Sequence, residues 1–108
     1  MSWGSWRRPA ATPFLRDLVD QYIAEVPVRL TQLQEFVRIG DMEAVGRVAH
    51  SLKGTSGTMG ATLAESACTE VEVAARKGRV GPERLERVSV ELGRAATALR
   101  ALAPTAAP

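Results

Sequence analysis

Hydrophobic residues recur every three or four positions along most of the chain, the spacing that gathers them on one face of a helix. No stretch alternates hydrophobic and polar residues with period two, so we expect no strand. The positions predicted to face inward are Leu15, Leu18, Val19, Tyr22, Val26, Leu30, Leu33 and Val37; Val45, Val48, Ala49, Leu52, Ser56 and Met59; Leu63, Ala67, Val71 and Ala74; and Leu85, Val88, Leu92, Ala95, Ala96, Leu99 and Leu102.

The first hydrophobic stretch contains a proline that should interrupt it. Thr12 and Pro13 have the residue types of an N-cap and a first helical position. Pro27 removes one helical hydrogen bond and crowds the preceding turn, so we expect a kink or break near residues 24–26. The pattern therefore predicts a short helix over about 13–25 and a second over about 27–39.

Residues that start or end helices divide the rest of the chain into three further segments. They are Gly40 as a helix end, Asp41 as an N-cap, Gly60 as an end, Thr62 and Glu65 as a capping box, Lys77-Gly78 as an end, Gly81-Pro82 as a start and Pro104 as a stop. Short connections between helices of this length favour antiparallel neighbours. The predicted fold is all-α: an up-down-up-down antiparallel four-helix bundle with a short extra N-terminal helix.

Length and composition indicate one ordinary globular domain. The chain has 108 residues, of which 45% are hydrophobic and 24% charged, and this suits a single core. We expect a tail or linker over 1–11, a bundle domain over 12–103 and a tail over 104–108. No motif accounts for Trp3 and Trp6 in the first of these segments.

Charge and cysteine content exclude several kinds of site. The net charge is only +2, and the basic residues are scattered, so they form no stripe for nucleic acid. A single cysteine, Cys68, excludes an internal disulfide and a cysteine-based zinc site, and it points to a reducing compartment. Neither an apolar run of about 18 residues nor a signal peptide is present. We therefore expect a cytoplasmic chain that does not enter a membrane.

The only histidine stands on the side of its helix that faces water. At about 100° per residue, His50 lies roughly 140° from the centre of the apolar face, and Gly46, Lys53, Gly54 and Gly57 lie within about 60° of it. Each glycine in a helix costs about 1 kcal/mol relative to alanine. Glycines on an exposed face therefore indicate another purpose, which we interpret as room for a second protein.

This combination of residues suits phosphoryl transfer. A neutral imidazole is a competent nucleophile near neutral pH, and Lys53 could neutralise anionic oxygens beside it. Transfer of a phosphoryl group depends mainly on positioning and charge neutralisation. A group on the next helix should hold the other ring nitrogen of His50, and Glu70 and Glu72 are both candidates.

Other interpretations remain open at this point. An exposed histidine, lysine or glutamate is ordinarily a solvated surface residue. Residues 61–82 could form a helix-turn-helix DNA-binding module, although its basic residues, Arg76, Lys77 and Arg79, share the segment with Glu65, Glu70 and Glu72. A non-catalytic helical scaffold is a third possibility. The glycines of residues 54–60 lack the ending of a phosphate-binding loop, and a lone histidine does not make a zinc site.

The segment His50-Ser51-Leu52-Lys53-Gly54, followed by Gly57 and Gly60-Ala61, resembles the motif of histidine phosphotransfer (HPt) domains. The Gly40-Asp41 turn and the Ala- and Glu-rich helix after Gly60 are similar to that family as well. The resemblance extends over about residues 13–102. It implies a phosphohistidine carrier in a two-component phosphorelay, which takes a phosphoryl group from a receiver-domain aspartate or a kinase domain and passes it to a response-regulator aspartate.

The resemblance also assigns roles to individual residues. His50 would accept the phosphoryl group on Nε2, Lys53 would hold its oxygens, and Gly54 and Gly57 would leave clearance for a receiver domain. Spacing from the histidine would give Glu72 the hydrogen bond to the imidazole.

The same resemblance implies what the chain would need from other proteins. The partners would be receiver domains of response regulators or hybrid sensor kinases, and the chain would act as a monomer. It would bind no cofactor, the Mg²⁺ for transfer would belong to the receiver, and without an ATP site the chain would not be a kinase. A free-standing protein and a module of a hybrid or chemotaxis-type kinase both fit.

Overall fold

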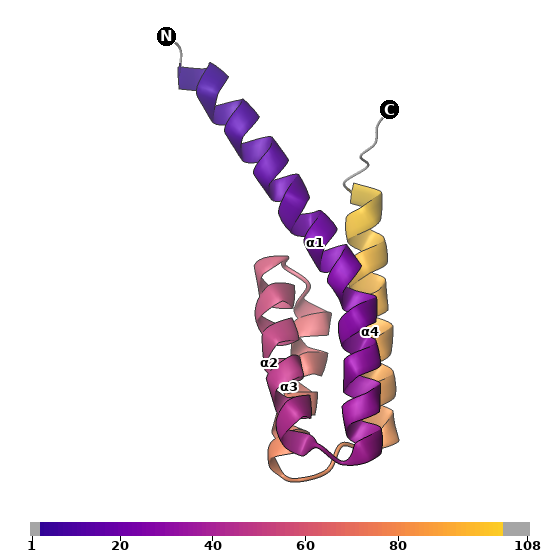
Figure 1. Cartoon of the computed structure of the whole chain (residues 1–108). Coiled ribbons are helices and arrows are strands. Elements are labelled where there is room, and N and C mark those ends of the chain that lie inside the picture. Colours follow the sequence, from indigo (N-terminus) through magenta and orange to yellow (C-terminus); the bar gives the residue numbers. More distant parts are fainter. Residues whose placement is uncertain (1–2, 103–108) are drawn as a thin grey trace.

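Four helices form the part of the protein that the computed structural model describes, namely the backbone of residues 3–102 and the side chains of residues 14–102. They are α1 (Trp3–Ile39), α2 (Met42–Thr58), α3 (Thr62–Arg76) and α4 (Pro82–Leu102). Helices α1 and α3 each pack against both α2 and α4, and successive helices are joined at alternate ends of the molecule (Figure 1). Residues 3–102 contain no strand, so the prediction of an all-α fold is confirmed.

Helix α1 runs without interruption through Pro27, so the predicted division into two helices near residues 24–26 is wrong. Proline inside a helix costs about 3 kcal/mol, but Tyr22, Val26 and Leu33 are buried on both sides of it. Burying side chains of this size stabilises by about 1.5–3 kcal/mol each, which exceeds that cost. Partway along, α1 bends, and its N-terminal part leans away from α4 (Figure 1). A proline in the helix interior is a known cause of such a bend.

The start of α1 also differs from the prediction. The helix begins at Trp3, so Thr12 is not its N-cap and the backbone of residues 3–11 is helical. Arginine and alanine are good helix formers, and four of the six residues from 7 to 12 are of these two types. The division into a tail, a domain over 12–103 and a second tail stays a prediction. Pro104 and the side chains of Trp3 and Trp6 lie outside the described residues.

Most of the other predicted helix ends are confirmed. The Asp41 side chain accepts a hydrogen bond of 3.1 Å from the Ala44 N–H, as an N-cap does. Gly40, Gly60 and Gly78 follow α1, α2 and α3 with φ of +80°, +74° and +97°, a left-handed backbone that favours glycine.

The predicted capping box is wrong. Ala61, not Thr62, is the N-cap of α3, and no side chain caps this end. The physical reason is that Glu65 turns toward α2. A Cβ atom built on Gly57 would lie 3.1 Å from Oε2 of Glu65, so the carboxylate occupies the space beside that glycine instead of reaching back to the helix end.

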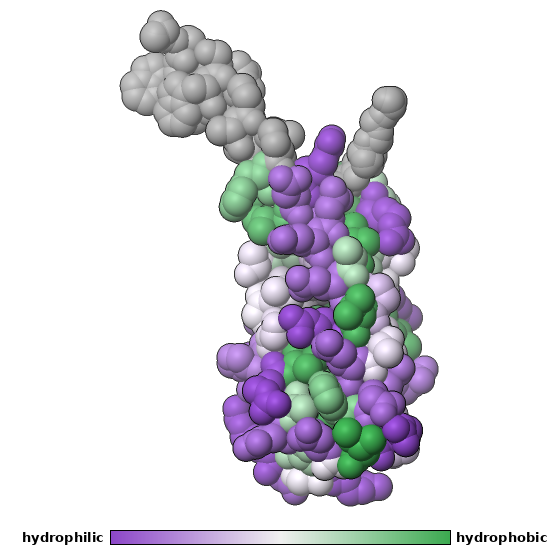
Figure 2. All heavy atoms as spheres, viewed as in Figure 1, coloured by the Kyte–Doolittle hydropathy of each residue, from purple (hydrophilic) through white to green (hydrophobic). Residues whose placement is uncertain are grey.

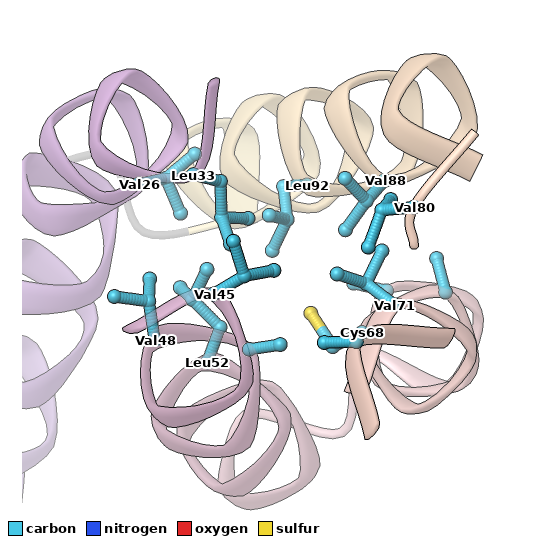
Figure 3. Close-up of a cluster of buried hydrophobic side chains, with 14 of the residues drawn as sticks. Val26, Leu33, Val45, Val48, Leu52, Cys68, Val71, Val80, Val88 and Leu92 are labelled. Carbon is cyan, nitrogen blue, oxygen red and sulfur yellow. The ribbon is translucent and has the colours of Figure 1, made fainter. Parts of the chain in front are cut away.

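The core lies between the four helices, and Figure 3 shows its side chains pointing inward from all of them. Its largest fully buried members are Leu33, Val45, Leu52, Cys68, Val71, Val88 and Leu92. Three predicted core leucines, Leu15, Leu63 and Leu102, are more than half exposed. Leu63 is the second residue of α3, Leu102 is the last residue of α4 and Leu15 lies in the N-terminal half of α1. In α3, Ala64 is buried in place of Leu63.

Most of the outer face consists of hydrophilic side chains, with small hydrophobic groups between them (Figure 2). Among residues 3–102, no helix combines the length and the hydrophobicity that crossing a bilayer requires.

One polar contact is part of the core. The hydroxyls of Tyr22 on α1 and Ser56 on α2 lie 2.7 Å apart, and neither residue is more than 3% exposed. Buried hydroxyls need a hydrogen-bond partner. The pair therefore ties α1 to α2 at a specific register.

Tyr22→Phe should lower the free energy of unfolding by about 1–3 kcal/mol, because it leaves the Ser56 hydroxyl buried without this partner. Adding Ser56→Ala to Tyr22→Phe should recover part of the loss, since both polar groups are then gone. Urea unfolding followed by circular dichroism measures both changes. A Tyr22→Phe variant as stable as the parent would contradict a structural role for this pair.

Candidate functional site

The packing of α2 against α3 brings His50 and Glu72 together. Nδ1 of His50 lies 2.9 Å from Oε2 of Glu72. The histidine side chain is 67% exposed, whereas the glutamate side chain is only 8% exposed. His50 thus lies on the outward side of α2, as its angular position predicted. The buried Glu72 carboxylate holds its ring through Nδ1.

Two cations complete the surroundings of that carboxylate. Lys53 Nζ lies 3.0 Å from Oε1 of Glu72, and Arg76 Nη2 lies 3.0 Å from Oε2. The hydrogen bond from Lys53 lowers the pKa of Glu72 below its ordinary value; burial opposes this effect, and the hydrogen bond from His50 adds to it. A buried charge is tolerated only with such partners. Glu72 is therefore ionised at neutral pH.

The ionised carboxylate determines which ring nitrogen of His50 carries the proton. A carboxylate accepts hydrogen bonds and cannot donate them, so Nδ1 of His50 must be the donor. In the neutral ring the lone pair then belongs to Nε2. Because the imidazole is largely exposed, the nitrogen that can act as a nucleophile is the one away from Glu72.

The three glycines around His50 have different surroundings. A Cβ atom added to Gly54 would meet nothing within 4 Å, whereas one added to Gly46 would lie 4.0 Å from the Cβ of Ala75 on α3. At Gly57 the Glu65 carboxylate already fills the space. Three glycines were interpreted as room for a second protein, and the resemblance assigned clearance to Gly54 and Gly57; of the three, only Gly54 has open space where a side chain would be.

The choice between the two candidate glutamates is made by their positions on α3. Glu70 forms an ion pair with Arg87 of α4, so it points to the other side of α3 and does not reach His50. Arg76 was not among the predicted site residues. The signal was present, since a glutamate followed four residues later by an arginine is a favourable pair on a helix.

An open pocket of about 550 Å³ lies beside His50, between α2 and α3. It extends toward the N-terminal end of α2, away from Lys53. It is lined by Met42, Glu43, Gly46, Arg47, His50, Glu72, Ala75 and Arg76. The imidazole therefore borders a surface hollow that Arg47 and Arg76 also line.

Other chemistry finds little support in this part of the chain. Burial raises the pKa of the Cys68 thiol to about 12, so it is not a nucleophile near neutral pH. Within residues 14–102, no three or more His, Cys, Asp and Glu side chains gather as a metal site would require. His50 is the reactive group that this site presents.

Comparison with known proteins gives one family match. The family model described as the Hpt domain matches residues 17–103, which include α2, α3, α4 and every residue in contact with Glu72. No curated protein and no solved structure matches the chain.

The lowered pKa of Glu72 predicts how stability depends on pH. Since the folded pKa lies below the ordinary value of 4.5, the stabilisation is complete above that pH and is lost as the pH falls through the folded pKa. Glu72→Gln should be less stable than the parent at pH 7 and should lose less stability between about pH 5 and pH 3. Urea unfolding at both ends of this range measures the difference.

The exposed Glu86→Gln on α4 is the matched control and should follow the parent. An equal acid-induced loss of stability in Glu72→Gln and the parent would show that Glu72 contributes nothing through its charge.

Proposed function

Because the chain belongs to the Hpt domain family, whose members are phosphohistidine carriers in phosphorelays, we propose that His50 is its phosphoryl-accepting residue. The phosphoryl group comes from the aspartate of a receiver domain, or from a kinase domain, and passes to the aspartate of a response regulator. The observation that carries this assignment is the hydrogen bond between Nδ1 of His50 and the buried Glu72 carboxylate. It leaves Nε2 as the exposed nucleophile.

The transfer step needs no redox partner and no base on this chain. The Nε2 lone pair of His50 forms a bond to phosphorus while the P–O bond to the donor aspartate breaks, and that electron pair stays on the aspartate carboxylate. The proton on Nδ1 remains in place, so the phosphorylated ring gains positive charge. Glu72 stabilises this charge, as a carboxylate does for an imidazolium ion. Delivery to the next aspartate is the same step in reverse.

Lys53 and Gly54 serve the phosphoryl group and the partner. Lys53 stands one helical turn from His50, where its ammonium group can neutralise phosphoryl oxygens. Gly54 stands on the following turn with open space where a side chain would be, so the partner's aspartate can approach the ring. We assign clearance to Gly54 rather than to Gly57, whose space the Glu65 carboxylate occupies.

The remaining expectations belong to the same proposal. The partners are receiver domains of response regulators or hybrid sensor kinases, and Mg²⁺ is held in the receiver. The chain acts as a monomer in the cytoplasm, and its helices run up-down-up-down, which the alternating ends of the loops support (Figure 1).

The DNA-binding alternative receives no support from the surroundings of α3. This helix packs against both α2 and α4, whereas a recognition helix must project into the major groove. Its basic residue Arg76 is paired with Glu72, which reduces the charge available to phosphates.

His50→Gln should abolish phosphoryl transfer. Incubation of the parent with a ³²P-phosphorylated receiver domain and Mg²⁺ should label the chain with a phosphoramidate, which is stable in base and labile in acid. Because His50 is the only histidine, His50→Gln should carry no such label. Label that persists in this variant would overturn the assignment, and a parent that never becomes labelled would favour the non-catalytic scaffold.

Gly54→Leu should slow transfer from a receiver by up to about a hundredfold, because it displaces the partner's aspartate from the ring. The matched control is Gly93→Leu on α4, where an added Cβ also meets nothing within 4 Å; it should transfer at the parent rate. Labelling by the small donor phosphoramidate should stay near the parent rate in both variants. If Gly54→Leu transfers from the receiver as fast as Gly93→Leu, Gly54 does not provide the clearance.

A further inference from the structure

The two oxygens of the Glu72 carboxylate have separate partners. Oε1 accepts from Lys53, while Oε2 lies within hydrogen-bond distance of both Nδ1 of His50 and Nη2 of Arg76. The lysine is therefore on the oxygen that does not touch the imidazole. The arginine shares the oxygen that does.

Phosphorylation of Nε2 would give the Lys53 ammonium group a second anion to pair with. A phosphoryl group carries close to two negative charges at neutral pH, and Glu72 carries one. An ammonium group within reach of both is attracted more strongly to the phosphoryl oxygens. With Lys53 on Oε1, the Glu72 side chain is only 8% exposed, and a buried carboxylate is destabilised when it loses one of its cations.

Arg76 is placed to prevent that loss. It lies four residues after Glu72 on the same helix, the favourable order for such a pair, so the contact does not depend on α2. We propose, building on the phosphoryl transfer proposed above, that Arg76 is a positioning residue. It holds Oε2 of Glu72 in place beside Nδ1 of His50 while Lys53 moves from Oε1 to the phosphoryl oxygens.

In the resting protein, Lys53 and Arg76 can therefore each hold Glu72 without the other. In the phosphorylated protein, Arg76 is needed. With Lys53 on Oε1, loss of Arg76 leaves Glu72 one cation, and the ring keeps its orientation. With Lys53 drawn away, Arg76 is the one cation besides the phosphorylated ring itself that contacts Glu72 within the described residues. Its removal then weakens the hydrogen bond to Nδ1.

The imidazole itself provides the measurement, because a chain with one histidine gives one unambiguous pair of ring ¹⁵N signals. In the unphosphorylated protein, Lys53→Ala reproduces the departure of the lysine. Adding Arg76→Ala to Lys53→Ala should lower the ratio of Nδ1–H to Nε2–H tautomers by about two- to fivefold, the size expected for an exposed pair. Arg76→Ala alone should change this ratio much less, and Arg76→Lys in the Lys53→Ala protein should restore it.

The matched control is Arg47→Ala. Arg47 is as exposed as Arg76, at 70% of its side chain, and it also approaches a glutamate four residues away, Glu43. It lines the same pocket but does not contact Glu72. Arg47→Ala in the Lys53→Ala protein should leave the tautomer ratio unchanged.

The phosphorylated state is tested with phosphoramidate, which transfers its phosphoryl group to the imidazole and releases ammonia. In phosphorylated Arg76→Ala, the Nδ1 proton should exchange with water about two- to fivefold faster than in the phosphorylated parent, because one charge-assisted contact is gone. Phosphorylated Arg47→Ala should behave as the parent.

Two results would overturn the role of Arg76. The first is an unchanged tautomer ratio when Arg76→Ala is added to Lys53→Ala, and the second is an equal effect of Arg47→Ala. The tautomer measurement needs no phosphoryl transfer, so it can fail while His50 is still labelled by a receiver. Conversely, failure of that labelling would overturn the proposed function and leave the tautomer result intact.

Discussion

A carboxylate buried between two helices must be neutralised where it lies, and this requirement organises the site. Glu72 is 8% exposed at its side chain and is surrounded by His50, Lys53 and Arg76. Each of these groups is held in place by its bond to the carboxylate, and the hydrogen bonds from Lys53 and His50 lower the pKa of Glu72, so that it is ionised. The orientation of the imidazole, its tautomer and the exposure of Nε2 all follow from this one buried charge.

The bundle makes that arrangement possible by allowing α2 and α3 to approach closely. Their shared surface is built from small residues: Gly46 faces Ala75, and Ala49, Ala64 and Ala67 are buried. Small side chains bring the two backbones near enough for a hydrogen bond between His50 and Glu72. Bulkier neighbours such as Leu33 and Leu92 come from α1 and α4, which close the core on the other side (Figure 3). The site thus lies where α2 packs against α3.

The three glycines near His50 lie on one side of α2 but have different surroundings. A Cβ atom on Gly46 would just touch Ala75 of α3, one on Gly57 would meet the Glu65 carboxylate, and one on Gly54 would face open space. Their common location near His50 suggested a single purpose. Only the position of α3 shows that Gly54 has open space where a partner could approach, whereas Gly46 and Gly57 face residues of α3.

The sequence by itself determined what depends on a single helix. The apolar face of α2, the Asp41 cap, the glycines that end three helices and the exposure of His50 all follow from local geometry. The predictions at Pro27 and Thr62 were wrong because tertiary contacts outweighed local propensity. At Pro27 these are the core contacts of α1, and at Thr62 it is the contact of Glu65 with α2. Only the tertiary structure chose Glu72 over Glu70 and brought Arg76 to the site. Two residues along a helix differ by about 200° in direction, so which carboxylate meets His50 depends on how α3 is rotated against α2, and the packing of the whole bundle sets that rotation.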